Sequence, residues 1–158
     1  ARYFPTRVPM LPTRTVVNLN GNATDASIGL AARVNRGHGY VSTVRPQDDI
    51  AINASLAVDS RHIGKEGSVH VLIHIEGQDF LQLDRNGNLQ PWDGSVAGLL
   101  PFAPAASLQP VEYVQVIEAV RLGDGFINRR LQVFVAYSVS GTEEVVYTAE
   151  PLVLDVAP

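Results

Sequence analysis

The sequence predicts an all-β protein: an antiparallel β-sandwich of immunoglobulin-like or related topology, with at most one short helix. Residues 49–59 alternate strictly between apolar and polar side chains, similar segments recur at short spacing, and Asn86-Gly87 stands between two apolar runs. Strict alternation is typical of a strand with one buried face, and Asn-Gly is the strongest short-range hairpin signal. We expect the other strands to pack around residues 80–94, which hold this turn and the only tryptophan, Trp92.

Length and composition fit one globular domain. The chain has 158 residues, 46% hydrophobic and 18% charged, with a net charge of -4 and no cysteine, which excludes disulfides and thiolate metal sites. The basic residues are scattered, so we expect no nucleic-acid partner. No apolar run approaches the roughly 18 residues of a membrane helix, so we also expect no membrane insertion.

The N-terminal part differs from the rest in composition. Three prolines oppose regular structure, so we expect residues 1–14 to be an extended arm or linker and residues 15–158 to be a single sandwich domain. An alternative is an arm whose Tyr3, Phe4 and Met10 dock on a neighbouring copy. Because the chain opens on Ala1 rather than methionine, we expect a mature protein or an excised domain.

In the first half of the chain, strand patterns alternate with Gly, Pro, Asn and Asp turn signals. His70 and His74 fall on the polar face of their strand, opposite valines and isoleucines. The expected elements are a strand over 15–19, a turn over 20–22, a turn over 34–37 leading into a strand over 40–44, a strand over 49–59, a polar loop over 60–67 and a strand over 69–75.

In the second half, the central prediction is the hairpin. Asn-Gly favours positive φ at both central turn positions, so Leu81 and Leu83 should pair with Leu89 across a two-residue turn. The other expected elements are a helical turn over 96–100, an irregular proline-rich loop over 103–110, a strand over 111–120 covered on both faces, a turn over 123–125, and strands over 131–139, 145–149 and 152–156.

Three segments together resemble a known kind of domain. They read DDIAINASLAVDSRHIGKEGSVHVLI, LQPWDGSVAGL and LQVFVAYSV…EEVVYTAEPLVLDV. With residues 90–94 and 149–152 as the matching motifs, the region 28–156 resembles an uncharacterised β-sandwich accessory module of secreted and surface proteobacterial proteins. The resemblance implies a non-enzymatic domain in an extracellular, cell-surface or periplasmic location. It carries over no functional residues.

Trp92, Asp93 and Tyr40 are the candidate binding residues. Aromatic rings can stack on the apolar faces of sugars, as they do in non-catalytic sugar-binding sandwiches. Tyr137 alternates with valines, which places it in the core instead. For Trp92 we expect a core plug between the sheets, with an exposed sugar platform as the alternative.

The sequence does not support a metal or cofactor. His70 and His74 are four residues apart, about 13 Å along a strand, so alone they cannot chelate one ion. Residues 84–88 resemble the start of a calcium loop, but an EF-hand needs Gly and Glu where Leu89 and Ser95 stand. Two alternatives stay open: a metal site shared between a histidine and another strand, and a calcium site that uses Asp79, Asp93 or the pair Asp48-Asp49.

Catalytic signals are weak. No G-x-S-x-G motif or phosphate loop occurs, and the adjacent pairs Asp48-Asp49 and Glu143-Glu144 point to opposite faces of a strand. We therefore expect no catalytic residues and no enzyme, although a hydrolase on a sandwich is a third possibility. The predicted function is a structural or adhesive interaction module of an exported bacterial protein, with another protein domain or a surface glycan as partner. The alternative is a carbohydrate-binding module that uses aromatic stacking.

Overall fold

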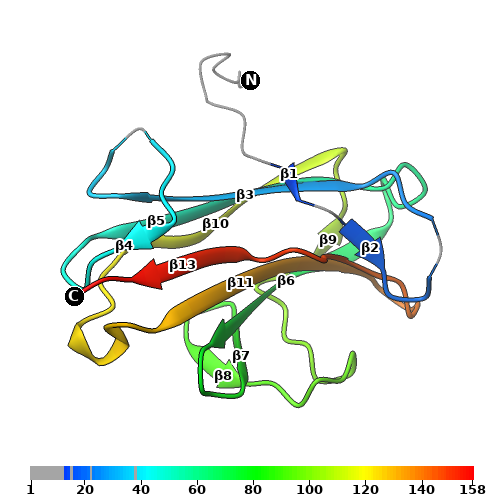
Figure 1. The fold of residues 1–158 in the computed structure, drawn as a ribbon. Coiled ribbons are helices and arrows are strands. Elements are labelled where there is room, and N and C mark those ends of the chain that lie inside the picture. Colours follow the sequence, from blue (N-terminus) through cyan, green and yellow to red (C-terminus); the bar gives the residue numbers. More distant parts are fainter. Residues whose placement is uncertain (1–12, 15, 22, 38) are drawn as a thin grey trace.

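The computed structural model describes residues 13–14, 16–21, 23–37 and 39–158, and it confirms the all-β prediction. Two sheets pack face to face as the layers of a sandwich (Figure 1). The smaller sheet has the order β1 (Thr13–Arg14), β3 (Ser27–Val34), β5 (Ile50–Ala57) and β10 (Val111–Val120). The larger sheet contains β2 (Val16–Asn18), β4 (Thr43–Val44), β6 (Glu66–Ile75), β7 (Phe80–Leu83), β8 (Leu89–Pro91), β9 (Ala103–Ser107), β11 (Arg130–Val139), β12 (Val145–Thr148) and β13 (Leu152–Val156).

The predicted arm over 1–14 is corrected at its end, because Thr13 and Arg14 pair with Gly29 and Ile28 of β3. Tyr3, Phe4 and Met10 lie outside the described residues. Within the described residues, the one helical segment is the 3-10 turn η1 (Asp124–Phe126), and no helix is long and apolar enough to cross a membrane.

Alternation along the strands builds the core. In β5 buried and half-buried residues alternate without a break, as predicted, and β11 turns Val133, Val135 and Tyr137 inward. These side chains meet the inward face of β6 from the same sheet and of β3 and β5 from the other. Tyr137 is fully buried, which confirms its predicted place in the core.

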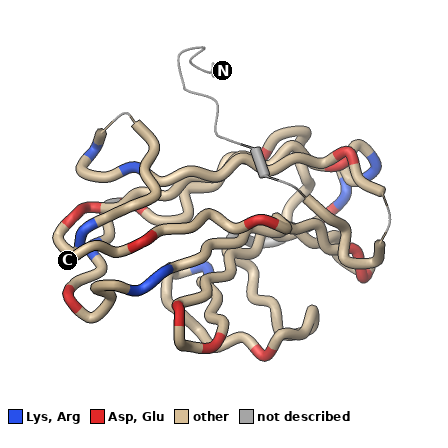
Figure 2. Tube along the Cα trace, in the orientation of Figure 1, with Lys and Arg blue, Asp and Glu red and all other residues tan. Residues whose placement is uncertain are grey.

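The larger sheet is organised around one long pair of strands. β6 and β11 pair along nearly their whole length, from Leu131 opposite Ile75 to Val139 opposite Gly67. Each is then flanked by two half-length strands, β7 and β9 on β6, and β12 and β13 on β11. Charged residues lie mainly in the loops and at the ends of the strands (Figure 2). The middle of the β6–β11 pair therefore has apolar or uncharged polar side chains on both of its faces.

The segment after β3 crosses from one sheet to the other. Asn35 and Arg36 turn the chain with φ angles of 52° and 59°, as the predicted turn requires. Val41 then donates its N–H to Ala32 of β3, whereas β4 pairs in parallel with β13. The predicted strand over 40–44 is thus reduced to two residues.

The β7–β8 hairpin is confirmed, but the predicted two-residue turn is wrong. Only Gly87 has a positive φ, of 80°, and the loop holds three residues between Asp84 and Asn88. The Asp84 carboxylate accepts hydrogen bonds from the N–H groups of Asn86 and Asn88. This carboxylate fixes the longer loop, in which glycine alone takes the left-handed conformation.

Two further expectations for the second half are wrong. Residues 96–100 form a turn, with Gly98 N–H donating to the Ser95 carbonyl, and no helix. Residues 103–107 form the edge strand β9 in place of an irregular loop, since Pro104 lies in a bulge where two residues oppose one residue of β6. At such a position proline removes no hydrogen bond of the ladder.

Strand β10 is covered on one face, not on both. Val111, Tyr113 and Val120 are 44%, 65% and 42% exposed, whereas Val114 and Val116 are buried. Among the described residues β10 pairs only with β5, at the edge of the smaller sheet. The continuous apolar run over 111–120 therefore belongs to an edge strand. A single sequence does not distinguish such a strand from a central one.

Candidate functional site

An open depression of about 750 Å³ lies beside the β7–β8 hairpin, at the edge of the larger sheet. It contains two of the three residues singled out from the sequence, Trp92 and Asp93. The lining consists of Gln78, Asp79, Phe80, Leu81, Pro91, Trp92, Asp93 and Gly94.

Phe80 is the centre of an aromatic cluster on the outer face of this sheet. Its ring centroid lies 4.7 Å from that of His74, 5.8 Å from that of Phe134 and 5.9 Å from that of Trp92. The register places Phe80 opposite His74, and the alternation within β7 turns Phe80 away from the core. All four rings are half-buried, so the cluster is a surface platform and not part of the core.

Trp92 does not plug the space between the sheets, so this expectation is wrong. It follows the last residue of β8 and donates its backbone N–H to the Phe80 carbonyl at 3.3 Å, which directs it to the outer side of the hairpin. The indole N–H donates to the Ser95 carbonyl oxygen at 2.9 Å, and the ring stands edge to face with Phe80 at 81°. One face of the hairpin thus presents a fixed, half-exposed tryptophan.

Asp93 holds the chain that follows Trp92. Its Oδ1 accepts the Ser95 hydroxyl at 2.6 Å and the Ser95 N–H at 2.9 Å, and these bonds lower the pKa of the Asp93 carboxyl. A Cβ atom at Gly98 would lie 2.5 Å from the same carboxylate oxygen, so a larger residue there would require the Asp93 side chain to move. Asp93 therefore carries its negative charge at the rim of the depression.

Residues 93–102, the covering segment, lie over the outer face of the larger sheet and are attached to it by two buried side chains. Gln82 is 2% exposed; its amide donates to the Gly98 carbonyl at 2.9 Å and accepts the Leu100 N–H at 2.8 Å. His70 is 4% exposed and bonds the Leu100 carbonyl through Nδ1 at 2.8 Å. His70 also bonds the Ser138 hydroxyl on the neighbouring strand β11 through Nε2 at 2.8 Å, so it is a buried cross-strand histidine, and its burial lowers the pKa of the imidazole.

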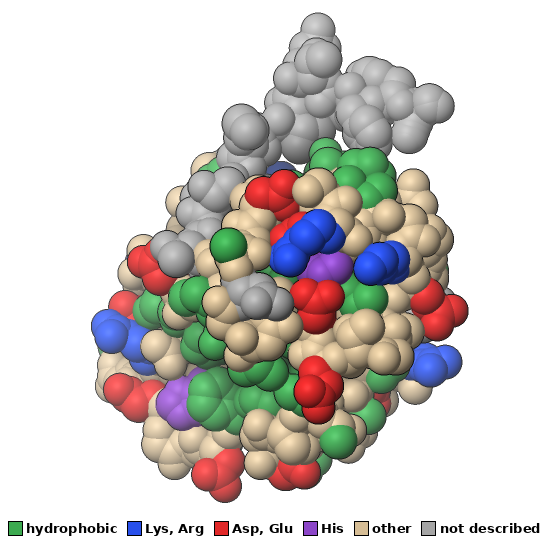
Figure 3. Space-filling view, turned by 90° about the vertical axis from the view of Figure 1, so that its right-hand side faces the viewer, with side chains coloured by type: hydrophobic (Ala, Val, Ile, Leu, Met, Phe, Trp, Pro, Cys, Tyr) green, Lys and Arg blue, Asp and Glu red, His purple; other side chains and the backbone are tan. Residues whose placement is uncertain are grey.

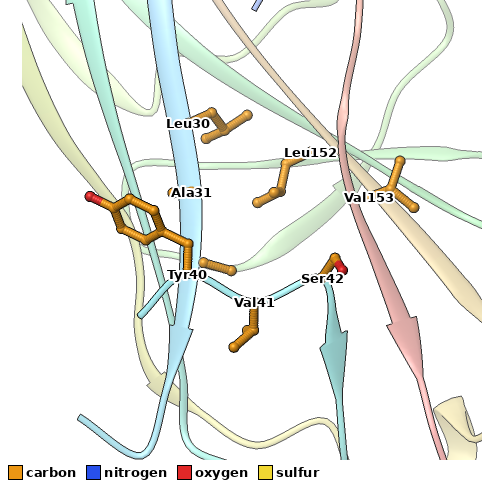
Figure 4. A pocket seen from close by; sticks show the side chains of 8 residues that line it. Leu30, Ala31, Tyr40, Val41, Ser42, Leu152 and Val153 are labelled. Atoms are coloured by element: carbon orange, nitrogen blue, oxygen red, sulfur yellow. The ribbon is translucent and has the colours of Figure 1, made fainter. Parts of the chain in front are cut away.

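Tyr40 lies apart from Trp92 and Asp93. It borders a separate hollow of about 320 Å³ on the open side of the sandwich, between β3 and β13. Figure 4 shows the Tyr40 ring on the β3 side of this hollow and Val153 on the β13 side. Since β13 and β8 are separated by β11, β6 and β7, the structure does not bring the three candidate residues into one site.

A second polar cluster closes one end of the sandwich. The imidazole of His62 lies between the Tyr137 hydroxyl, 2.8 Å from Nδ1, and the Glu144 carboxylate, 3.1 Å from Nε2. Asp59 accepts the Thr24 hydroxyl at 2.7 Å and pairs with Arg61 at 2.9 Å. Figure 3 shows acidic and basic side chains around a histidine at this end.

Burial and hydrogen bonding set the protonation of this cluster. Burial raises the pKa of Tyr137 to about 12, and the hydrogen bond from Arg61 holds the pKa of the Asp59 carboxyl well below its usual range. Asp59, His62 and Tyr137 are each at most 1% exposed, and both ring nitrogens of His62 have partners within the cluster. Such an internally satisfied cluster is suited to holding loops together.

The carboxylates proposed as alternative calcium ligands do not form a calcium site. Some are hydrogen-bonded to protein groups, and the others do not come together, within the described part of the chain, in a group large enough to hold an ion. Asp48 accepts the Arg45 N–H at 2.8 Å and the Asn35 amide at 2.9 Å, and the Arg45 hydrogen bond leads in lowering its pKa. Asp84 is occupied by its own loop. Among the described residues no three His, Asp or Glu side chains are placed to hold one metal ion.

Sequence reasoning missed Phe80 as the centre of the platform and the buried Asp59 and His62. A signal for Phe80 was present, because alternation from Leu81 and Leu83 puts it on the same face as His74. For Asp59 and His62 no comparable signal exists, since their partners Thr24, Tyr137 and Glu144 are 35 to 82 residues away in the chain.

Comparisons with known proteins leave the site to be interpreted from its own geometry. No protein-family description, no curated protein and no solved structure matches the chain. The resemblance based on residues 90–94 and 149–152 accordingly stays a prediction.

Proposed function

We propose that this protein is a non-enzymatic binding module and that the Trp92 depression binds a carbohydrate. One observation carries the proposal: two half-exposed rings, Phe80 and Trp92, share an open depression with Asp79, Asp93 and Gln78. A sugar ring offers an apolar face of C–H groups and an edge of hydroxyls. Aromatic rings suit the first, and carboxylate and amide groups accept hydrogen bonds from the second.

The placement of Trp92 favours this function over the core-plug interpretation. Its backbone and its indole N–H are both held by hydrogen bonds to neighbouring carbonyls, so the ring is oriented before a ligand arrives. A preorganised ring loses little conformational entropy on binding. An extracellular, cell-surface or periplasmic location, which we propose from the sequence resemblance, would bring the module into contact with glycans.

The polar cluster at the other end supports a binding module more than an enzyme. His62, Tyr137 and Glu144 are the residue types of a proton relay, but Tyr137 is fully buried and already accepts the Asp59 N–H. A catalytic base must reach the proton that it removes from a substrate. We therefore assign this cluster a structural role.

A second function, a protein-interaction module, is favoured by a different observation. Glu66 and Arg130 mark the two ends of the β6–β11 pair. Between these ends, the outward positions of both strands hold no Asp, Glu, Lys or Arg. Depletion of charge is typical of the centre of protein interfaces. The outward residues that stay partly exposed are Ser68, Leu72, His74, Gln132, Phe134 and Ser138, whereas His70 and Ala136 are buried.

A glycan array tests the first function. The wild-type protein should bind a set of related glycans, Trp92→Ala should bind none of them, and Tyr40→Ala should bind as the wild type does, because Tyr40 lies in a separate hollow. Binding by Trp92→Ala at wild-type strength would place the site elsewhere. An array without any wild-type signal would reject the carbohydrate proposal and leave the interaction module.

A further inference from the structure

The Trp92 depression has a one-sided charge. Its lining includes two exposed carboxylates, Asp79 and Asp93, and no Lys, Arg or His. Asp93 is ionised more readily than usual, since hydrogen bonds from the Ser95 side chain and backbone lower its pKa. Within the part of the chain that the structure describes, the Asp79 carboxylate has no hydrogen-bond or ion-pair partner, and the Asp93 carboxylate is hydrogen-bonded only by Ser95 and by its own N–H.

The two rings of the depression form a corner. The planes of Phe80 and Trp92 are 81° apart and their centroids 5.9 Å apart, so one ring presents its edge to the face of the other. The faces of aromatic rings carry negative potential and attract ammonium groups, most strongly for tryptophan. Two nearly perpendicular rings next to carboxylates are therefore complementary to a positively charged group. A neutral hydroxyl gains less from the negative potential of this arrangement.

We infer that the depression selects sugars with a free ammonium group, such as glucosamine units, over N-acetylated or acidic sugars. The inference rests on the proposed carbohydrate function and names the class of sugar. An ammonium group between the rings and the carboxylates would gain cation–π contact and charge-assisted hydrogen bonds together. A carboxylated sugar would instead meet two like charges.

The basic residue at the neighbouring turn is Arg129. Its Nη1 donates to the Glu76 carbonyl oxygen at 3.1 Å, and the residue does not line the depression. Removing this charge by Arg129→Gln should strengthen the binding of an ammonium sugar without changing that of a neutral one. The expected change is small, about two- to threefold, because exposed charges are screened by solvent.

The deciding experiment compares two oligosaccharides of equal length that differ only in whether their amino groups are free or acetylated. Chitosan and chitin oligomers are titrated into the full chain by calorimetry at about pH 5, where the glucosamine amines are protonated and ordinary carboxylates are still ionised. We expect the chitosan oligomer to bind at least tenfold more tightly at low salt, with the preference shrinking at high salt. The double variant Asp79→Asn with Asp93→Asn should lose the preference, whereas Glu118→Gln, an exposed acid on β10, should keep it.

The outcomes separate the two proposals. Equal affinity for both oligomers, or binding of neutral glycans alone, would overturn the ammonium preference and leave carbohydrate binding intact. No binding of either oligomer and no signal on the glycan array would overturn both. A preference that survives in the double Asp variant, with circular dichroism and melting unchanged, would show that the two carboxylates do not provide it.

Discussion

The hydroxyl of Tyr137 lies 2.8 Å from Nδ1 of His62, and this contact sets the direction of a buried hydrogen-bond chain. The hydroxyl oxygen already accepts the Asp59 N–H at 3.0 Å, so its own hydrogen is available to Nδ1. In the His62 tautomer that carries its proton on Nε2, Nδ1 accepts this hydrogen and Nε2 donates to Glu144 at 3.1 Å. With this tautomer every polar group of the cluster has a hydrogen-bond partner, from the loop at Asp59 to the turn before β12.

Tyr137→Phe should destabilise the fold. Without the hydroxyl, Nδ1 of His62 and the Asp59 N–H remain buried without a partner, which costs about 1–3 kcal/mol. Urea unfolding should show the loss. Tyr147→Phe, at a half-buried position on β12, is the matched control and should change stability by less than about 0.5 kcal/mol. Equal effects of the two variants would argue against the hydrogen-bond chain.

Trp92→Ala should have a moderate effect on stability. The ring is half-exposed and contributes an edge-to-face contact with Phe80, an arrangement worth about 0.5–1.5 kcal/mol beyond the area it buries. The loss should therefore fall short of the roughly 3–5 kcal/mol typical of a tryptophan in the core. Because Trp92 is the only tryptophan, fluorescence reports it alone, and iodide should quench it readily. A blue-shifted, unquenched emission would contradict this placement.

Asp59 should make the protein sensitive to acid. The Arg61 hydrogen bond holds the folded pKa of Asp59 below the unfolded value of about 3.9, so its contribution to stability is complete above about pH 4 and is lost as the pH falls from there through the folded pKa. Stability should therefore decline steeply below about pH 4. Asp59→Asn should lower stability at neutral pH by about 1.5–3 kcal/mol and flatten this decline. Denaturant titrations across pH, with Glu118→Gln as the control, measure both effects.

Gly67→Ala should be destabilising although alanine is a small residue. A Cβ atom at this position of β6 would overlap the Ser138 carbonyl oxygen of β11 and the side chain of Leu108. Forcing extra volume into a packed site costs about 1–3 kcal/mol. Gly125→Ala, where the added atom meets nothing within 4 Å, should leave the melting temperature unchanged. A neutral Gly67→Ala would show that both β11 at Ser138 and the segment at Leu108 can move aside.

Local patterns determine much of this fold. Alternation of side chains specifies which face of β5, β6 and β11 is buried, because the period of a strand is two whatever it packs against. Asn86-Gly87 likewise fixes the position of a hairpin, although the Asp84 carboxylate, and not the dipeptide, selects the three-residue loop. Trp92 and Asp93 were identified as candidate binding residues from their types alone, and the structure places both in one depression.

What covers each surface was decided by tertiary structure. His70 and His74 have the same place in the pattern of β6, yet the covering segment buries His70 and leaves His74 to pack on Phe80. The residues next to Trp92 in the sequence would equally allow its ring to enter the core. Trp92 is exposed because its backbone pairs with Phe80, on the outward side of β7. The sequence by itself determined where strands and turns form, because those depend on neighbouring residues. Only the tertiary structure decided which faces meet water and which distant groups share a hydrogen bond, because burial depends on residues far apart in the chain.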